Sequence, residues 1–399
     1  MPIEKHHCDY LRGQLFFLIG FLIVNTSLAC EDGMEFIYSD SIVCYIERSD
    51  YKVVSKEANE LLSCGPAAVS VGREMTVAYL ADEDSPIETE SSTSIFLRAS
   101  RFSIDNVSYT LRFVDIAKAN ATLFNHQSGS QIPYEPNLLN RGDSVLICLY
   151  REGGMSGPYV CCDISINDFQ CSNYQYLTLD GKKMDPASAI SSYKALSSRE
   201  VKNVHLIFTT RIIKDKDYYY GYLGGYGFYG ILIRSTDGVN WESITTPESM
   251  ETLSYVIEGA IGIDPVTSNL FFCGRGDDVM FCGFNADFKQ IVPSRLLSGT
   301  TTSKPTFFVY HDRLYLIVNM QNDTEYSNGR RNTANIYRID GETGELLLVK
   351  TLKCKEGCSY HSVQLVDDEI WVIFQTDGRH IALEDQGRSN LALFNLKMN

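Results

Sequence analysis

The chain has few cations for its size and almost no long apolar runs. Its 35 lysines and arginines face 50 aspartates and glutamates, so the formal net charge is −15. This excess of negative charge argues against binding to nucleic acid or to anionic membrane surfaces. It does not exclude a small anionic ligand, because a local arginine cluster decides that question and distant charges are screened within about 8–10 Å. Apolar residues at helical spacing over long stretches are also scarce, which argues against a mainly helical protein.

The one long apolar run, residues 15–24, lies near the beginning of the chain. Basic residues precede it, and Ser27-Leu28-Ala29 offers small side chains for cleavage before Cys30, a pattern typical of a secretory signal peptide. An uncleaved membrane anchor is the alternative, although the run is shorter than the ~20 residues that a span needs. A bacterial lipoprotein signal fits less well, because Ser27 stands where such signals have leucine. We therefore expect a signal peptide over residues 1–29, a secreted or extracellular-surface domain over residues 30–399, and no later membrane span.

Sequons and cysteines agree with secretion. Four Asn-x-Ser/Thr sequons offer sites for glycosylation, at Asn25, Asn106, Asn120 and Asn322. Twelve cysteines in a secreted chain imply disulfides. Removal of Cys8 from the twelve leaves eleven, so at least one thiol is free or forms a disulfide with another chain. The candidate pairs are Cys273 with Cys282 across one hairpin, and Cys354 with Cys358 ahead of Tyr360.

Three motifs with well-known functions have simpler structural explanations. Cys161, Cys162 and Cys171 could bind zinc, but adjacent cysteines without histidine partners suit a tetrahedral site poorly, so no metal or other cofactor is expected. Residues 225–230 match Gly-x-Gly-x-x-Gly, yet they lead into a strand, whereas a dinucleotide site opens a helix. Two Arg-Gly-Asp tripeptides, at 141–143 and 275–277, could bind integrins, but hairpin turns explain both.

The rest of the chain repeats one unit six times. Each unit has two apolar strands joined by a tight polar turn, then a loop and a third strand. Successive units start roughly 45–80 residues apart, at or somewhat above the spacing of radial β-sheet repeats. Six such units predict an all-β fold, a six-bladed β-propeller; a β-sandwich and a right-handed β-helix are the alternatives. The units start at residues 66, 144, 204, 259, 306 and 362.

A tyrosine precedes the sixth unit. Tyr360 stands ahead of an apolar strand at 362–365, which an acidic turn joins to a second apolar strand at 370–374. These residues alone predict a β-hairpin. The segment also resembles the one in which sialidases, including the trans-sialidases of protozoa, carry their nucleophilic tyrosine. This resemblance implies a sialidase-like propeller that acts on terminal sialosides as a retaining exo-glycosidase, with sialylated glycans or glycoproteins as its partners.

The segment that ends the third unit carries a second resemblance to the same family. Residues 235–241 read Ser-Thr-Asp-Gly-Val-Asn-Trp, which resembles the Asp-box of sialidase-type propellers, Ser-x-Asp-x-Gly-x-x-Trp, with one residue deleted. In that turn the aspartate accepts backbone N–H bonds and the tryptophan packs between strands. The resemblance therefore implies a structural role for Asp237 and Trp241 and no catalytic one.

The chemistry of the family indicates which groups Tyr360 needs. Sialic acid carries a carboxylate on its anomeric carbon, which would repel a carboxylate nucleophile, so these enzymes use a tyrosine activated by a glutamate. Three arginines bind the substrate carboxylate through charge-assisted hydrogen bonds. Order and spacing match the family at Glu258, which opens the fourth unit, and at Arg275, which ends its second strand. The next match is Arg331, or its neighbour Arg330, which opens the third strand of the fifth unit.

The first unit departs from the family pattern. Where the family has Phe-Arg-Ile-Pro, residues 63–66 read Ser-Cys-Gly-Pro, so Cys64 stands in place of one arginine of the clamp. The acid/base aspartate of the family has its counterpart within residues 79–94, where Glu90, with Glu88 as the alternative, falls nearest the expected place. Glutamate is one methylene longer than aspartate, which displaces the proton donor by roughly an ångström and lowers the rate.

Three functions are consistent with these residues. The first is a secreted sialidase or trans-sialidase, weakened by the loss of one clamp arginine, which costs about 1.5–3 kcal/mol. The second is a non-catalytic sialoside-binding or adhesion propeller, and the third is a protein-interaction scaffold that uses its loops and an unpaired cysteine. Taken singly, Tyr360 could be a packed aromatic, Glu258 a loop residue and Arg331 a surface cation. Their convergence at one end of the propeller would favour the first two functions.

Overall fold

The computed structural model describes most of residues 42–399. The residues that lie outside the description are 1–41, 56–59, 85–94, 119–132, 143, 153–156, 195–204, 209–210, 227–229, 247–248, 250–252, 254–255, 257, 276–278, 301–302, 321–330, 377–388 and 399. The predicted signal peptide, Glu88, Glu90, Arg330 and three of the four sequons are among them. The fourth sequon, at Asn106, is exposed. Within the described part of the chain, no helix is both long and apolar enough to cross a membrane.

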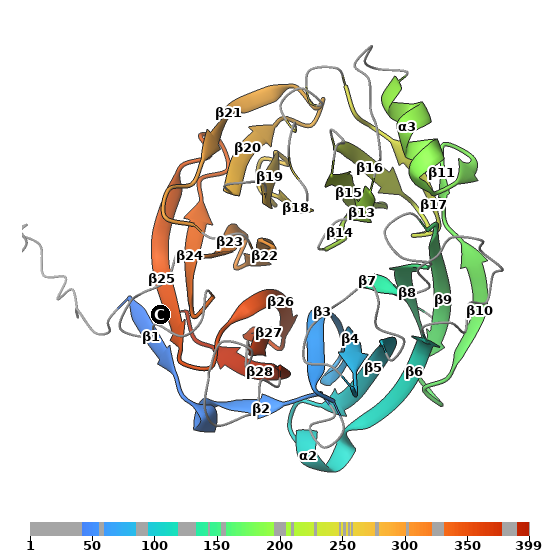
Figure 1. Cartoon of the computed structure of the whole chain (residues 1–399). Helices are drawn as coiled ribbons and strands as arrows, with labels where there is room; N and C mark the ends of the chain where they lie inside the picture. Colours follow the sequence, from blue (N-terminus) through green and yellow to red (C-terminus); the bar gives the residue numbers. More distant parts are fainter. Residues whose placement is uncertain are drawn as a thin grey trace, which may run out of the picture. The chain divides into compact units, whose positions relative to one another are not determined.

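The described residues form six β-sheets arranged in a ring around a central axis, which confirms the expected six-bladed propeller (Figure 1). The first sheet consists of β3 (Leu62–Val71), β4 (Glu74–Asp82), β5 (Phe96–Ser103) and β6 (Arg112–Lys118). The second consists of β7 (Tyr134–Gly142), β8 (Val145–Arg151), β9 (Tyr159–Ser165) and β10 (Cys171–Tyr176). The third consists of β13 (His205–Phe208), β14 (Ile213–Asp215), β15 (Tyr218–Tyr226), β16 (Ile231–Ser235) and β17 (Asn240–Ser243), extended by β11 (Thr178–Leu179) and β12 (Lys182–Lys183).

The other three sheets complete the ring. The fourth consists of β18 (Glu258–Ile263), β19 (Leu270–Arg275), β20 (Val279–Phe284) and β21 (Gln290–Leu296). The fifth consists of β22 (Thr306–Tyr310), β23 (Arg313–Asn319), β24 (Thr333–Ile339) and β25 (Leu346–Cys354), joined by β1 (Val43–Ile46). The sixth consists of β26 (Ser359–Val366), β27 (Glu369–Thr376), β28 (Asn390–Leu396) and β2 (Tyr51–Val53). The helical segments among the described residues are η1 (Arg48–Asp50), α2 (Val107–Thr110) and α3 (Pro186–Lys194).

The second sheet differs from the unit predicted for it. We expected that unit to begin at residue 144, but β8 and β9 are its second and third strands, and the inner strand is β7. Residues 134–142 contain a proline, two asparagines and an arginine, so they lack the apolar pattern of a strand. They form a strand because β8 and the inner strand of the first sheet lie beside them. The packing of the ring therefore overrides a weak local signal.

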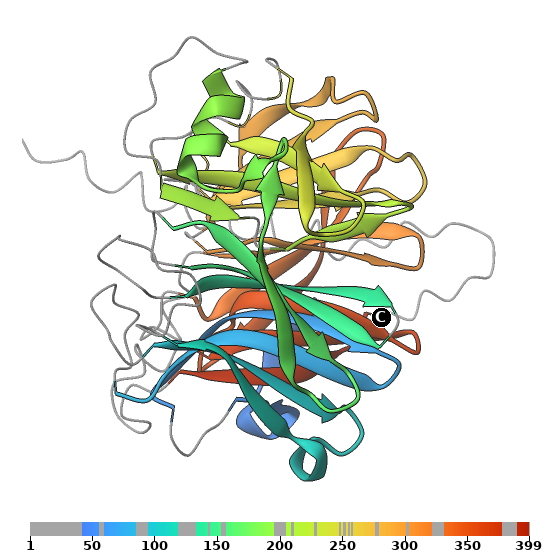
Figure 2. The ribbon, with the colours of Figure 1, turned by 90° about the vertical axis from the view of Figure 1, so that its right-hand side faces the viewer.

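Six apolar cores lie between neighbouring sheets, one at each junction. In the fourth sheet, for example, Cys273 faces the core shared with the fifth sheet, whereas Phe272 faces the core shared with the third. Successive strand residues point to opposite faces, so a strand that is buried on both faces reads as a continuous apolar run. This two-sided burial explains the apolar strands that the repeats predicted. Seen from the side, the sheets have the twist that is usual for propeller blades (Figure 2).

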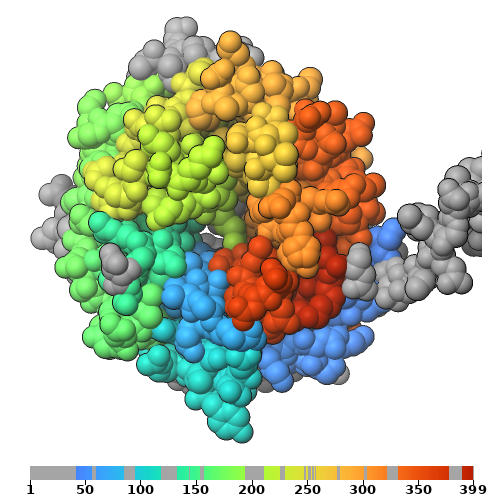
Figure 3. Space-filling model, turned by 180° about the vertical axis from the view of Figure 1, so that it is seen from behind, coloured from blue at the N-terminus to red at the C-terminus, as the bar shows by residue number. Residues whose placement is uncertain are grey.

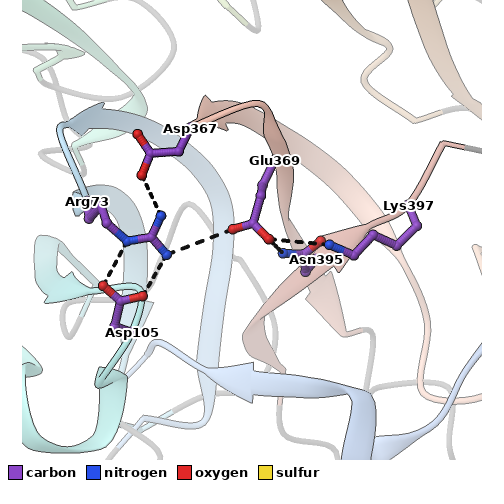
Figure 4. Close-up of polar contacts among 6 residues, drawn as sticks. All are labelled: Arg73, Asp105, Asp367, Glu369, Asn395 and Lys397. Atoms are coloured by element: carbon purple, nitrogen blue, oxygen red, sulfur yellow. Dashed lines mark hydrogen bonds and ion pairs between the residues drawn. The ribbon is translucent and has the colours of Figure 1, made fainter.

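The ring closes where the first sheet meets the sixth. Strand β2 pairs antiparallel with β28, so the sixth sheet receives its outer strand from the beginning of the described chain. Arg73, in the turn between β3 and β4, crosses the same junction (Figure 4). Its guanidinium group binds Asp105, two residues after β5, at 2.6 Å. It also lies 2.6 Å from Asp367, in the turn between β26 and β27, and 3.8 Å from Glu369 of β27. Backbone pairing at the edge and an ion-pair network thus hold this junction together.

The predicted disulfide between Cys273 and Cys282 is absent from the structure. None of the ten cysteines among the described residues forms a disulfide. In the register of β19 and β20, Cys273 faces Phe281 and Cys282 faces Phe272. The two thiols therefore point to opposite faces of the sheet, where no bridge can form. Cys354 and Cys358 share the core between the fifth and sixth sheets and are likewise unbonded.

The turn between β16 and β17 is stabilised by its aspartate. Asp237 accepts hydrogen bonds from the backbone N–H groups of Val239 and Asn240, both at 2.8 Å. Trp241 is buried between the second and third sheets, and its indole N–H donates to the carbonyl of Gly238 at 3.1 Å. These contacts fix the direction of the chain as it enters β17, which is a structural role.

We predict that Phe271→Ala destabilises the protein by about 3–5 kcal/mol, because it empties part of the core between the fourth and fifth sheets. Phe271 is fully buried and stacks on Phe281 with ring centroids 5.8 Å apart. Denaturant unfolding measures the change. Leu365→Ala, at a side chain that is 43% exposed, is the control and should cost less than about 0.5 kcal/mol. Equal losses in the two variants would contradict the two-sided packing.

Candidate active site

The antiparallel sheets bring the predicted residues to equivalent strand ends. Glu258 begins β18, and its register partner is Arg275, the last residue of β19. Arg331 lies two residues before β24, and Tyr360 is the second residue of β26. In an antiparallel sheet the first strand begins, the second ends and the third begins at the same end. Four residues from three successive sheets therefore lie at the same end of their sheets.

Lys304 connects these residues. Its Nζ lies 3.1 Å from Oε1 of Glu258, while Nε of Arg275 lies 2.9 Å from Oε2 of the same carboxylate. Lys304 Nζ also lies 5.8 Å from the centroid of the Tyr360 ring, and Cζ of Arg331 lies 4.8 Å from it. The structure therefore brings Glu258, Arg275, Arg331 and Tyr360 together around one lysine that the sequence did not single out. A direct hydrogen bond between the Tyr360 hydroxyl and Glu258 stays a prediction.

Three neighbouring cations lower the pKa of Glu258 by more than burial raises it. The residue is 6% exposed, and burial alone would raise its pKa. The charges of Lys304, Arg275 and Arg331 have the opposite effect, and the pKa of the Glu258 carboxyl is lowered. Burial would likewise lower the pKa of the Lys304 ammonium group, but Glu258, Glu135 and Tyr360 raise it. The ion pair is thus charged on both sides at neutral pH, and the cluster has an excess of positive charge that suits an anionic ligand.

Tyr360 has a strained backbone. Its φ is 51°, in the left-handed region that large side chains rarely adopt, and it lies at an irregularity of the pairing between β26 and β27. The chain is held on both sides: the amide of Asn319 donates to the carbonyl of Cys358 at 2.7 Å, and the hydroxyl of Thr306 donates to the carbonyl of His361 at 2.7 Å. Strain of this kind persists only where the surroundings enforce it, and it is frequent at functional sites.

A second residue was missed by the sequence analysis. Glu135 is the second residue of β7 in the second sheet, and its negative charge is one of the causes that raise the pKa of Lys304. The hydroxyl of Tyr159 donates to Oε2 of Glu135 at 2.7 Å and orients it. Lys304 lies two residues before β22, near a predicted strand start, so a search around such starts could have found it. The start of β7 was not predicted, so no such signal pointed to Glu135.

The first sheet contributes differently from the family pattern. Cys64 is 4% exposed and packs in the apolar core between the first and second sheets. Arg98, the buried arginine near the start of β5, binds Glu60 at 2.5 Å and Asp115 at 2.7 Å. Asp82, at the end of β4, is fully buried, and Glu90 lies outside the described residues. Neither Cys64 nor the carboxylate-bound Arg98 therefore offers the cation that the family pattern has in this sheet.

A separate cavity of about 210 Å³ lies along the inner strands. Residues of β3, β7, β14 and β26 line it, together with Arg211, whose guanidinium donates to the carbonyl of Val363 at 3.1 Å. In Figure 3 a narrow opening is visible where these parts of the sequence meet. Burial lowers the pKa of Arg211 to about 9. Burial, and then the charge of Arg211, lower the pKa of the neighbouring His361 to about 3.

We predict that the stability of the protein falls as the pH falls from about 6.5 toward 3, because the unfolded state binds a proton at His361 that the folded state excludes. One such histidine contributes at most about 1.4 kcal/mol per pH unit. Denaturant unfolding at several pH values should show a smaller slope for His361→Leu than for the wild type. His311→Leu, at an exposed histidine, is the control. A slope that His361→Leu leaves unchanged would contradict the prediction.

Comparisons with known proteins identify the fold. No protein-family model matches the sequence, and no curated protein sequence matches it. Among solved structures, Trypanosoma rangeli sialidase in complex with sialic acid matches with a TM-score of 0.53 at 13% identity, over 88% of this chain and 57% of that one. The NanB sialidase from Streptococcus pneumoniae matches with a TM-score of 0.60 at 9% identity, over 88% of this chain and 71% of that one. At these identities the likeness concerns the fold, and this chain has the six-bladed fold of the trypanosomal and streptococcal sialidases.

Proposed function

We propose that this protein is a secreted or cell-surface glycosidase of the sialidase type, which removes or transfers terminal sialic acid. The observation that carries the proposal is the meeting of Tyr360, Glu258, Arg275 and Arg331, from three successive sheets, around one positively charged centre. The fold it shares with sialidases supports the assignment. The basic and apolar N-terminal segment and the exposed sequon at Asn106 support secretion.

The reaction follows from the chemistry of the ligand. Arg275 and Arg331 bind the sialoside carboxylate, and the phenol oxygen of Tyr360 attacks the anomeric carbon as Glu258 accepts the phenol proton. The bond between that carbon and the leaving oxygen breaks, and Glu90 donates a proton to the leaving group. Water, or the hydroxyl of an acceptor sugar, then attacks the anomeric carbon as Glu90, now a carboxylate, accepts its proton. The bond from that carbon to the Tyr360 oxygen breaks, Glu258 returns the proton to this oxygen, and the anomeric configuration is retained. The proposed sequence requires no metal or other cofactor.

We predict that the full chain releases the fluorophore from a fluorogenic sialoside and that Tyr360→Phe lowers the rate on the order of 10³-fold or more, because the variant lacks the nucleophilic oxygen. Tyr109→Phe, at a side chain that is 92% exposed, is the matched control and should keep the wild-type rate. Wild-type turnover that survives in Tyr360→Phe would refute the assignment of the nucleophile.

One observation favours a second candidate, a non-catalytic sialoside-binding propeller. Both oxygens of Glu258 are engaged by cations, and its pKa is lowered, which makes the carboxylate a weaker base for the phenol proton. A binder needs only the cations and not the nucleophile. Such a protein would retain sialylated glycans on a surface without cleaving them.

We predict for this second candidate that Arg331→Ala loses about 1.5–3 kcal/mol of sialoside affinity, whereas Tyr360→Phe keeps most of it. A glycan array, followed by titration of the best ligand, measures both. Arg338→Ala, near the far end of β24, the strand that Arg331 precedes, is the matched control. A wild type that neither cleaves nor binds sialosides would leave the third function, an interaction scaffold that uses its loops and an unpaired or intermolecularly bonded cysteine.

A further inference from the structure

We propose that Lys304 is the third cation of the carboxylate clamp, in place of the arginine that the first sheet lacks. The inference rests on the proposed function and adds to it a ligand-binding residue that has no counterpart among the family positions matched above. The ligand class is a sugar acid with one carboxylate next to the reacting carbon. Lys304 would bind that carboxylate together with Arg275 and Arg331.

The position of Lys304 suits this role. Its side chain is 18% exposed, the same fraction as that of Arg275, so both cations lie at the edge of the buried cluster and face solvent to the same extent. The ammonium group contacts the fourth sheet through Glu258 and the sixth through the ring of Tyr360. A ligand that approaches Tyr360 therefore also approaches Lys304.

Neither Cys64 nor Arg98, the two described residues of the first sheet considered for this role, offers a free cation there. Cys64, which stands where the family has arginine, is packed in an apolar core. Arg98 of the same sheet has a side chain that is only 6% exposed, and Glu60 and Asp115 bind it. A charge that two carboxylates already neutralise attracts a third carboxylate weakly. Among the described residues, Lys304 is the cation that lies over the Tyr360 ring together with Arg331.

Lysine can bind a ligand and Glu258 at the same time. An ammonium group has three N–H donors, and the contact with Glu258 uses one of them. The raised pKa keeps Lys304 charged while a ligand carboxylate enters. Because lysine acts as a point charge and lacks the planar fork of arginine, it contributes attraction with less control over the orientation of the carboxylate.

The alternative role of Lys304 is purely structural, as the neutralising partner of buried Glu258. The two roles differ in how they depend on the charge of the ligand. A structural defect weakens the binding of every ligand of the site alike. A lost clamp cation weakens the binding of the carboxylate form and leaves an uncharged analogue of the same shape unaffected.

The experiment compares an α-methyl sialoside with its methyl ester, each titrated against the full chain by calorimetry. Lys304→Met should bind the acid roughly 10- to 100-fold more weakly than the wild type and bind the ester unchanged. Lys304→Arg should bind the acid within a few-fold of the wild type. The matched control is Lys183→Met, which removes another lysine that is paired with a carboxylate, Asp185, in the third sheet; it should change neither affinity.

The outcomes separate the inference from the function on which it rests. If Arg331→Ala weakens binding of the acid and Lys304→Met does not, the clamp exists without Lys304 and the inference is wrong. Equal losses for acid and ester would assign Lys304 a structural role and also overturn it. Cooperative unfolding shows that a variant is folded. If Lys304→Met fails this test, Lys304→Gln, which lacks the charge, is compared with Lys304→Arg, which keeps it, in the binding of acid and ester. A wild type that binds neither ligand overturns the proposed function, and the inference with it.

Discussion

The pairing of β2 with β28 is the constraint on which the site depends. A propeller leaves only short, protected sheet edges, and here the outermost strand of the sixth sheet comes from the beginning of the described chain, which ties the two ends of the ring together. The Arg73 network spans the same junction. Because the site takes residues from the fourth, fifth and sixth sheets, a small rotation of one sheet would separate the cations from Tyr360. Closure of the ring fixes those distances.

The sequence predicted the parts of the fold in which local pattern and tertiary environment agree. Strands such as β19 and β27 are buried on both faces, so they read as continuous apolar runs and could be found without the structure. Strand β7 reads as polar, and the short strands β1 and β2 find their partners in distant sheets, so no local signal marks them. The disulfide prediction for Cys273 and Cys282 was wrong because spacing along a hairpin does not give the register, and one position of shift reverses the face.

In the candidate site, too, some residues could be predicted from the sequence and others could not. Glu258, Arg275, Arg331 and Tyr360 could be named because the family pattern ties each to a strand end, and strand ends are visible in the sequence. Lys304 and Glu135 correspond to no position of the family pattern. Their relation to Glu258 and to one another exists only in the folded ring, where charges from the second, fourth and fifth sheets meet. The pairing of each cation with a carboxylate depends on distances in the folded protein, and the order of residues along the chain does not give these distances.

The junction between β2 and β28 also bears on how the protein is made. Tyr51 pairs with Phe394, so nearly the whole described chain lies between the two partners, and their encounter carries a large loop-closure entropy. During synthesis β2 emerges long before β28, and it stays unpaired until β28 has been made. Strand β2 has only three residues, which is too short for a stable pairing with a strand of another chain. Its short length therefore limits aggregation before the ring closes. Ring closure is thus a late folding event. While the chain is being synthesised, the residues of the candidate site are therefore not yet held together.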